Sequence, residues 1–207
     1  AGRVIYRPRH RVDQLVRASG VVTGVRGLVL APDASPRGVA SNRIVEGEFE
    51  YGGQAVVVTS GGIGGNHDLV RANWPQRLGE APADMLTGVP AYVDGRMLAI
   101  TEAAGGAVVN RDRMWHYVEG VRNWDPVWPG HAIRILAGPS AMWFDGRGNR
   151  LPAPYFPGFD TLGTLDHLQH TGVEHSWFIL NRALAGKEFA LSGSEQNLDL
   201  TERRYRD

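Results

Sequence analysis

A glycine-rich run between two apolar stretches has the composition of a ligand-binding turn. Ser60–Gly65 contains four glycines in six residues, and Asn66 follows with a side chain suited to cap a helix. Because glycine permits close backbone approach and a helix start presents free N–H groups, this pattern favours phosphate or ribose binding. It departs from the dinucleotide fingerprint G-x-G-x-x-G, since His67 stands at the last glycine position. A tight turn without a ligand is the alternative.

A second candidate region, Met114–Phe144, mixes large aromatic rings with charged groups. His116 and Tyr117 are adjacent in it, and His131 and Arg134 follow. An apolar pocket with a few polar groups suits a ring-shaped ligand. Ordinary core packing of the tryptophans is the alternative, and the sequence leaves both open.

Three histidines raise the question of a metal. His167 and His170 would share one helix face, with His175 nearby. Zinc sites usually add a cysteine or carboxylate at short spacing, and the chain has no cysteine. We therefore expect surface or packing roles for these histidines and no metal, with a metal hydrolase as a remaining alternative.

The elements that must position these residues change character near Pro75. Before it, β-branched or alternating stretches predict a strand meander, and Ala55–Thr59 reads as a buried strand. A helix from His67 to Trp74 would end at Pro75. The other strands expected in this part are Val4–Tyr6, Arg9–Leu15, Val21–Leu30 and Arg43–Tyr51.

After Pro75 helices and short strands mix, so we expect an α+β fold. Apolar residues recur at helical spacing within Pro90–Gly105, which predicts a helix there. Asp160 is placed to cap a second helix over Thr161–His170. A short helix is expected over Asn181–Ala185. The expected strands are Ala107–Val109, Ile133–Leu136, Ala141–Phe144 and Ser176–Leu180.

Composition excludes several classes of function. With 22 basic and 22 acidic residues the net charge is zero, so nothing points to nucleic acid or an anionic membrane. No apolar run approaches the roughly 20 residues of a membrane span. The absence of cysteine rules out disulfides and fits a cytoplasmic location. A homo-oligomer is compatible with the sequence.

The motifs resemble those of the fumarate reductase and ketosteroid dehydrogenase superfamily of flavoproteins. Thr59–Asn66 is similar to its T-G-G-x-G-x-N turn, and Ala141–Leu151 to a segment of its substrate-covering domain. The resemblance runs from about Arg9 to Thr201. In order, further segments resemble a bacterial group of FAD-binding dehydrogenases: NHDLVRANWP, VDGRML, DRMWHY, FPGFDTLGTL and EFALSGSEQN.

This resemblance implies a domain organisation. Residues 1–75 would be the β-meander and glycine turn of a partial FAD-binding domain. Residues 76–195 would form a mixed α/β domain that caps the substrate, and residues 196–207 a loose tail. The chain would then be the middle of a longer protein, inactive by itself and with an incomplete FAD site.

The resemblance also implies how FAD would bind. Val12 would approach the adenine through its backbone. The turn would contact the cofactor through Ser60, Gly61, Gly62, Gly64 and Asn66.

The implied chemistry is hydride transfer between a CH–CH bond and flavin N5, with a side chain moving the accompanying proton. Ketosteroid dehydrogenases use tyrosine, which favours Tyr155 or Tyr117 as the proton carrier. His116, His131 and Arg134 would stabilise charge. The leading hypothesis is an FAD-dependent dehydrogenase of an apolar, steroid-like small molecule. The alternative is a non-catalytic ligand-binding or interaction module of the same fold without flavin.

Overall fold

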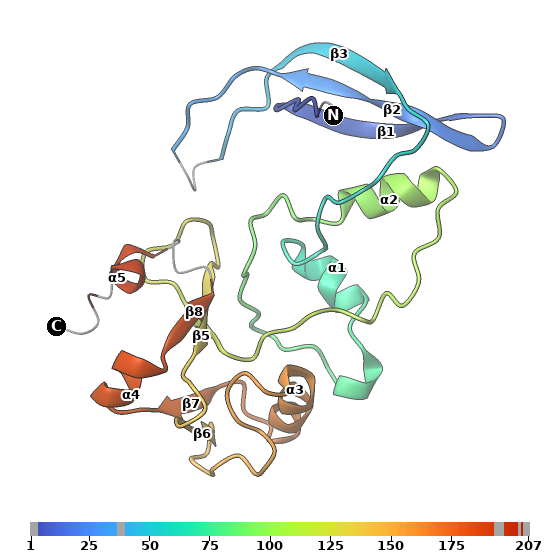
Figure 1. The fold of residues 1–207 in the computed structure, drawn as a ribbon. Coiled ribbons are helices and arrows are strands. Elements are labelled where there is room, and N and C mark those ends of the chain that lie inside the picture. The colour runs from blue at the N-terminus through green and yellow to red at the C-terminus, as the bar shows by residue number, and fades with distance from the viewer. Residues whose placement is uncertain (1–3, 37–39, 193–196, 203, 205–207) are drawn as a thin grey trace. The chain divides into compact units, whose positions relative to one another are not determined.

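The computed structural model of the chain describes residues 4–36, 40–192, 197–202 and 204, which fall into two compact units (Figure 1). Unit 1 comprises the residues up to Gly62 together with Val93–Val109. Unit 2 comprises Ile63–Tyr92 and the residues from Asn110 onward. The chain therefore enters unit 1 twice, which differs from a single division at residue 75. The assignment of cofactor and substrate roles to parts of the chain stays a prediction.

Unit 1 is built on an antiparallel sheet of three strands in the order β1-β2-β3. These are β1 (His10–Ala18), β2 (Val21–Leu30) and β3 (Val45–Gly52), which confirms the expected meander. A two-residue turn joins β1 to β2, with φ of 51° at Ser19 and 81° at Gly20. Positive φ at both positions matches the twist of a hairpin.

Two glycines of β2 let its neighbours approach closely. A Cβ atom at Gly27 would overlap the carbonyl of Arg11, and one at Gly24 would overlap the carbonyl of Tyr51. Gly27 pairs with Val12, directly before an irregularity in the β1 register. Only a residue without a side chain fits at these two positions. The buried side chains of the unit 1 sheet are Leu15, Leu30 and Phe49.

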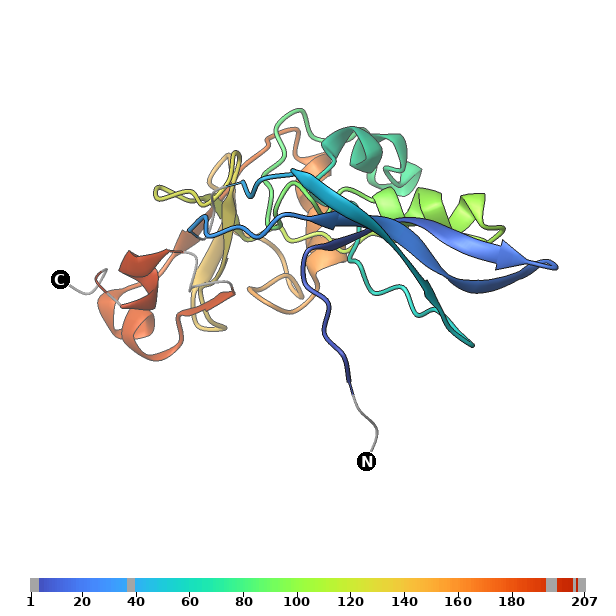
Figure 2. The ribbon, with the colours of Figure 1, turned by 90° about the horizontal axis from the view of Figure 1, so that it is seen from above.

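Helix α2 (Arg96–Ala103) lies against the sheet beside β1 in both ribbon views (Figures 1 and 2). The Arg96 guanidinium forms an ion pair with the carboxylate of Asp13 on β1. The helix is shorter than the expected range Pro90–Gly105. Gly95 precedes it with a left-handed φ of 81°. Gly105 follows it with a φ of 87°, and neither conformation continues a helix.

Unit 2 contains two small antiparallel sheets, β4-β5-β8 and β6-β7, and several short helices. Side-chain caps begin the helices where the sequence predicts them. Asn66 Oδ1 accepts from the N–H of Leu69 at 3.0 Å, and Asp160 Oδ1 from the N–H of Gly163 at 2.9 Å. The elements are α1 (His67–Ala72), η1 (Gln76–Leu78), β4 (Gly120–Arg122), β5 (Ala132–Leu136), β6 (Met142–Asp145), α3 (Thr161–His170), β7 (Ser176–Ile179), α4 (Arg182–Lys187), β8 (Ala190–Ser192) and α5 (Leu198–Thr201).

The core of unit 2 combines apolar and polar side chains. Ile133 on β5 and Trp143 on β6 are 1% and 3% exposed. The Trp143 indole donates to the Ser176 hydroxyl at 2.9 Å, so this buried ring has its polar partner. His131, Thr164 and Asn197 are buried with them.

Three of the expected strands do not form. Val4–Tyr6, Ala55–Thr59 and Ala107–Val109 are outside the strands of the described chain. The prediction that Ala55–Thr59 is buried is wrong as well, since Val57 is 83% exposed. The physical reason is shared: a strand needs a partner for its backbone, and no described segment pairs with these stretches.

The region expected to be a loose tail is partly ordered. Helix α5 lies within it, and Leu200 is 5% exposed. Residues 196, 203 and 205–207 of this range are outside the described part of the chain.

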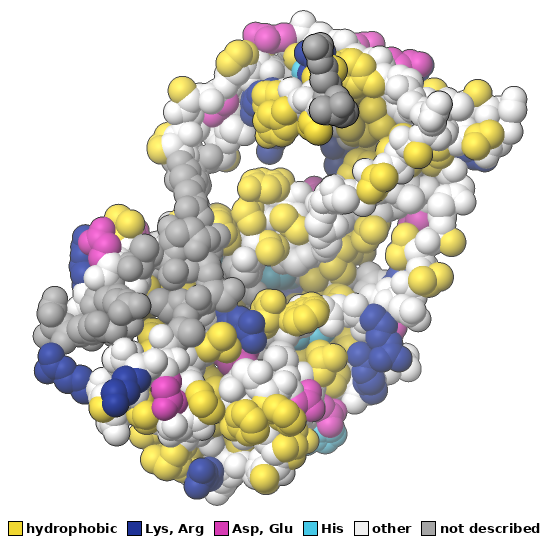
Figure 3. All heavy atoms as spheres, in the orientation of Figure 1, with side chains coloured by type: hydrophobic (Ala, Val, Ile, Leu, Met, Phe, Trp, Pro, Cys, Tyr) yellow, Lys and Arg dark blue, Asp and Glu magenta, His cyan; other side chains and the backbone are white. Residues whose placement is uncertain are grey.

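The fold is α+β, as expected, with small antiparallel sheets. Hydrophobic side chains, yellow in Figure 3, reach the surface of each unit at many places. Among the described residues, none of the helices is long and apolar enough to span a membrane.

Candidate functional site

The first half of the glycine turn belongs to unit 1 and has an accessible backbone. Ser60, Gly61 and Gly62 are all exposed. Gly61 has a φ of 84°, which disfavours other residues there, and a Cβ at Gly62 would have no atom within 4 Å. The glycine at position 62 is therefore not needed for packing. An open backbone of this kind fits a cofactor that approaches the main chain directly, as a flavin nucleotide would.

The second half of the turn belongs to unit 2 and is held by local contacts. A Cβ at Gly64 would lie 3.0 Å from the Val89 side chain, so this glycine has a packing reason. The N–H of Asn66 bonds to the carbonyl of Ile63 at 2.8 Å. With the Asn66 side chain capping α1, the predicted cofactor residues Gly64 and Asn66 both have structural roles.

Helix α1 is tied to the centre of unit 2 through its first residue. His67 Nε2 and the Thr87 hydroxyl form a hydrogen bond of 3.0 Å. Thr87 is buried and bridges to the chain at His131. The exit from the glycine turn is thus anchored to a buried side chain of an isolated β-bridge.

Val12 lies on β1, an edge strand of the described sheet. It is partly exposed and stands just before the register irregularity opposite Gly27. Among the described residues, the outer edge of β1 has no strand partner, so backbone recognition of an adenine there fits the geometry.

The structure brings two of the predicted catalytic residues together. The guanidinium carbon of Arg134 lies 4.1 Å from the centre of the Tyr117 ring. Glu119, whose side chain is 1% exposed, is 3.3 Å from Arg134 Nε through its carboxylate. The buried carboxylate therefore holds the guanidinium over a half-exposed phenol.

His116 is placed in a different environment from its neighbour Tyr117. Its ring packs against Trp74 with centroids 4.8 Å apart. Burial lowers the pKa of His116, and the positive charge of Arg77 lowers it further. The ring is therefore neutral at neutral pH, which suits hydrogen bonding rather than charge stabilisation.

His131 is a core residue. It is 2% exposed and stacks on Trp128 with centroids 3.9 Å apart. Its Nδ1 accepts from the Val127 N–H at 3.1 Å and from the Asn123 amide at 3.0 Å. These contacts assign it to the positioning of the segment that leads into β5.

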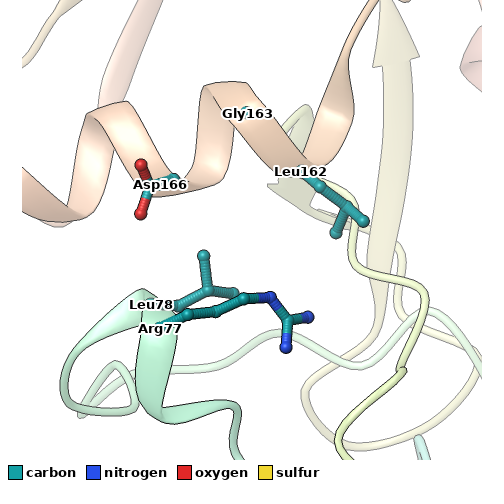
Figure 4. A pocket seen from close by; sticks show the side chains of 5 residues that line it. All are labelled: Arg77, Leu78, Leu162, Gly163 and Asp166. Carbon is teal, nitrogen blue, oxygen red and sulfur yellow. The ribbon is translucent and has the colours of Figure 1, made fainter.

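Tyr155 lies in the turn segment before α3 and packs against His167 of that helix with ring centroids 5.2 Å apart. A cavity of about 360 Å³ opens between η1 and α3 (Figure 4). Arg77 and Leu78 line it from η1, and Leu162, Gly163 and Asp166 from α3. Its size is in the range of small-molecule pockets.

The three histidines considered for a metal have other contacts. His167 packs on Tyr155, and His175 makes an edge-on contact with Trp177. His170 Nδ1 donates to the carbonyl of Asp166 at 2.7 Å. In the described part of the chain, no group of three potential ligands is arranged to hold a metal ion.

The five predicted catalytic residues thus occupy separate places in unit 2, and the side-chain contact found among them is that of Tyr117 with Arg134. The sequence reasoning missed Glu119 and Trp74. Glu119 stands two residues after Tyr117, the spacing at which an extended chain presents side chains on one side, and this signal was available. No sequence pattern around Trp74 predicts its contact with His116, because the two residues are far apart in the sequence.

Comparison with known proteins gives the family to which the chain belongs and two similar proteins. The family model described as "FAD binding domain" matches residues 1–204. The chain is 60% identical over 205 residues to a KsdD-like steroid dehydrogenase of Mycolicibacterium smegmatis, covering 99% of the chain and 38% of that protein. It is 58% identical over 201 residues to one of Mycobacterium tuberculosis, covering 97% and 36% respectively. The chain spans less than two fifths of the length of these relatives.

Proposed function

Because the chain belongs to the FAD binding domain family, we propose that the full-length protein is an FAD-dependent dehydrogenase acting on a CH–CH bond of an apolar ring compound. The similar mycobacterial proteins are named steroid dehydrogenases, which supports a steroid-like substrate. Bound FAD would accept or donate the hydride. The chain's own residues then have to bind the cofactor, exclude water and move one proton.

The cofactor role falls to the exposed part of the glycine turn. Ser60, Gly61 and Gly62 offer their backbone without obstruction, and Val12 offers the free edge of β1. The substrate role falls to residues 76–195 as a cap, because exposed aromatic rings gather there. Trp115 and Tyr117, for example, are 81% and 50% exposed.

The observation that carries the proposal is the arrangement of Tyr117, Arg134 and Glu119. A half-exposed phenol is the kind of group that can take a proton from a carbon, given a fixed ring orientation. Arg134 fixes the ring by stacking on it, and buried Glu119 fixes Arg134. Tyr155, packed on His167, is the second candidate for the same step.

The test uses the purified full-length protein with a steroid ketone under anaerobic conditions. We expect the visible absorbance of oxidised flavin, and we expect the steroid to bleach it. Tyr117→Phe should slow bleaching by about a hundredfold or more, the lower end of general acid–base effects, and retain the flavin. Tyr92→Phe, which alters an exposed tyrosine, is the matched control.

Each outcome decides between the alternatives. A wild-type protein without flavin would contradict the proposal and favour the non-catalytic module. If Tyr155→Phe alone slows bleaching, the proton step belongs to Tyr155 instead of Tyr117.

A further inference from the structure

Thr87 is a buried residue of unit 2 whose backbone and hydroxyl are all hydrogen-bonded. Its N–H donates to the carbonyl of Gly130 at 2.9 Å. Its carbonyl accepts from the N–H of Ala132 at 3.0 Å and from the Trp128 indole at 3.2 Å. With the hydroxyl bonded to His67, Thr87 cannot shift without breaking hydrogen bonds in a site that is 9% exposed.

The chain around Thr87 supports the exit of the glycine turn at two points. The bond of 3.0 Å between its hydroxyl and His67 Nε2 fixes the residue that directly follows Asn66. Two positions after Thr87, the Val89 side chain would lie 3.0 Å from a Cβ at Gly64. One support is therefore polar and the other apolar, and both come from the same short stretch of unit 2.

The turn exit is not buried. Ile63–Asn66 are the turn residues that belong to unit 2, and each of them is partly exposed. The bond from the Asn66 N–H to the Ile63 carbonyl lies within the turn, so it sets the shape of the turn and not its place in unit 2. Because a partly exposed turn can shift at small cost, we infer that the contacts with Thr87 and Val89 determine where the turn exit lies.

The backbone of Thr87 connects this support to β5. Ala132, whose N–H bonds to the Thr87 carbonyl, is the first residue of that strand. Thr87 also forms an isolated parallel bridge with His131, directly before the strand. Arg134, two residues further along β5, stacks on Tyr117. Thr87 thus ties the turn exit to the strand that carries the proposed proton-transfer arrangement.

We propose that Thr87 is a positioning residue of the flavin site. Through His67 its hydroxyl holds the exit of the glycine turn against β5, in the place from which the turn binds FAD. Hydride and proton transfer require groups held at fixed distances, which is the physical reason for such a tie. This inference rests on the proposed function, because it needs a flavin at the turn. The role is indirect and involves no bond-making step.

The experiment measures the dissociation constant of FAD in the full-length protein, by diluting the flavin-loaded protein and following the fluorescence of released flavin. Thr87→Val keeps the size of the side chain and removes the hydroxyl. We expect it to weaken FAD binding about fivefold, the effect of one hydrogen bond. Thr87→Ser keeps the hydroxyl, so its dissociation constant should stay within about twofold of the wild-type value.

His67→Phe removes the other partner of the same bond, at a partly exposed position. This variant, Thr87→Val and the double variant should all weaken FAD binding by the same factor, because each breaks one and the same interaction. Thr171→Val is the matched control. It removes a hydroxyl that donates to the Leu168 carbonyl at 2.7 Å at the end of α3, and it should leave FAD affinity unchanged.

A second measurement needs no variant. Hydrogen–deuterium exchange of the full-length protein, with and without its flavin, reports how tightly single amides are held. FAD should slow exchange at the amides of Thr87 and Ala132, whose bonds link the turn exit to β5. The amide of Thr164 in α3, bonded to the Asp160 carbonyl at 3.0 Å, should not change. Protection confined to the glycine turn would overturn the inference.

The outcomes separate this inference from the proposed function. Equal weakening by Thr87→Val and Thr87→Ser would mean a packing role. A lower melting temperature of Thr87→Val with unchanged FAD affinity would mean a role in stability alone. Either result overturns the inference and leaves the flavin assignment intact. A wild-type protein without flavin would contradict the proposed function itself, and the inference would fall with it.

Discussion

Strand β2 and the stretch Ala55–Gly65 have similar compositions, but β2 is a paired strand and Ala55–Gly65 is irregular. Both are rich in valine and glycine and have few polar residues. β2 pairs along its length with β1 on one side and β3 on the other. Ala55–Thr59 forms no strand in the described chain, and Val57 is 83% exposed. β-branched residues therefore make a strand only where backbone partners are available.

The glycines of the two stretches differ in the same way. Gly24 and Gly27 of β2 are crowded by carbonyl groups of neighbouring strands, whereas Gly62 has open space around the position of a Cβ. Packing explains the first two glycines and does not explain the third. An uncrowded glycine with an exposed backbone is therefore a better candidate for a ligand contact than a glycine that packing requires.

The largest change in the free energy of unfolding is expected for a substitution at Gly27. In Gly27→Ala the new methyl group overlaps the Arg11 carbonyl, so β1 and β2 must separate. We expect a loss of about 3 kcal/mol or more in the free energy of unfolding, the upper range of overpacking effects. Urea denaturation measures it. Gly47→Ala in β3, where a Cβ meets nothing within 4 Å, is the control, and an equal loss there would break the comparison.

A smaller loss of stability is expected when an apolar side chain of β2 is truncated, and almost none when one of Ala55–Gly65 is truncated. Leu30, at the end of β2, is 4% exposed. In this chain Leu30→Ala should cost about 2–3 kcal/mol of unfolding free energy, whereas Val57→Ala should stay within about 0.5 kcal/mol. Thermal unfolding of both variants tests this. A comparable cost at Val57 would show that Ala55–Thr59 is packed after all.

The sheet that contains β2 and the stretch Ala55–Gly65 should also differ in their response to acid, because strand β1 of that sheet has an ion-paired carboxylate. Burial raises the pKa of Asp13 on β1, but hydrogen bonds from Arg11 and Arg96 outweigh it and hold the pKa below its ordinary value. The unfolded chain then takes up the proton at a higher pH than the folded chain. The stabilisation is therefore complete above pH about 3.9 and is lost as the pH falls through the folded-state pKa.

The variant Asp13→Asn tests this acid sensitivity. It should make the loss of unit 1 stability with falling pH less steep, followed as unfolding free energy against pH. Asp68→Asn, at a fully exposed carboxylate of unit 2, should leave the acid response in place. Ala55–Gly65 contains no ionisable side chain, so no acid effect originates there. An unchanged slope in Asp13→Asn would contradict the prediction.

The smallest effect on stability is expected at Gly62. Gly62→Ala should change the free energy of unfolding by no more than about 0.5 kcal/mol, because the methyl group meets no neighbour. In the full-length protein the same change should weaken FAD binding about tenfold if the cofactor approaches this backbone. Gly88→Ala, equally uncrowded, should affect neither quantity. Unchanged FAD affinity in Gly62→Ala would remove the glycine from the proposed site.

Elements with local signals were predictable. The caps Asn66 and Asp160 begin helices where expected, because a cap acts on N–H groups two or three residues away. Asn181, expected as the first residue of a helix, is the cap of α4 instead. The hairpin turn at Gly20 likewise depends only on residues next to each other in the sequence. The site was less predictable. Tyr117 and Arg134 were named separately, and their contact depends on the pairing of β4 with β5.

By itself the sequence determined the strand meander, the capped helices, the α+β class and the resemblance to FAD-binding dehydrogenases. Each of these rests on short-range spacing or on ordered motifs. Only the tertiary structure decided that Ala55–Thr59 lacks a partner, that Glu119 is buried beneath Arg134, and that Trp74 meets His116. The physical reason is that strand pairing and the burial of polar atoms depend on groups brought together from distant parts of the chain.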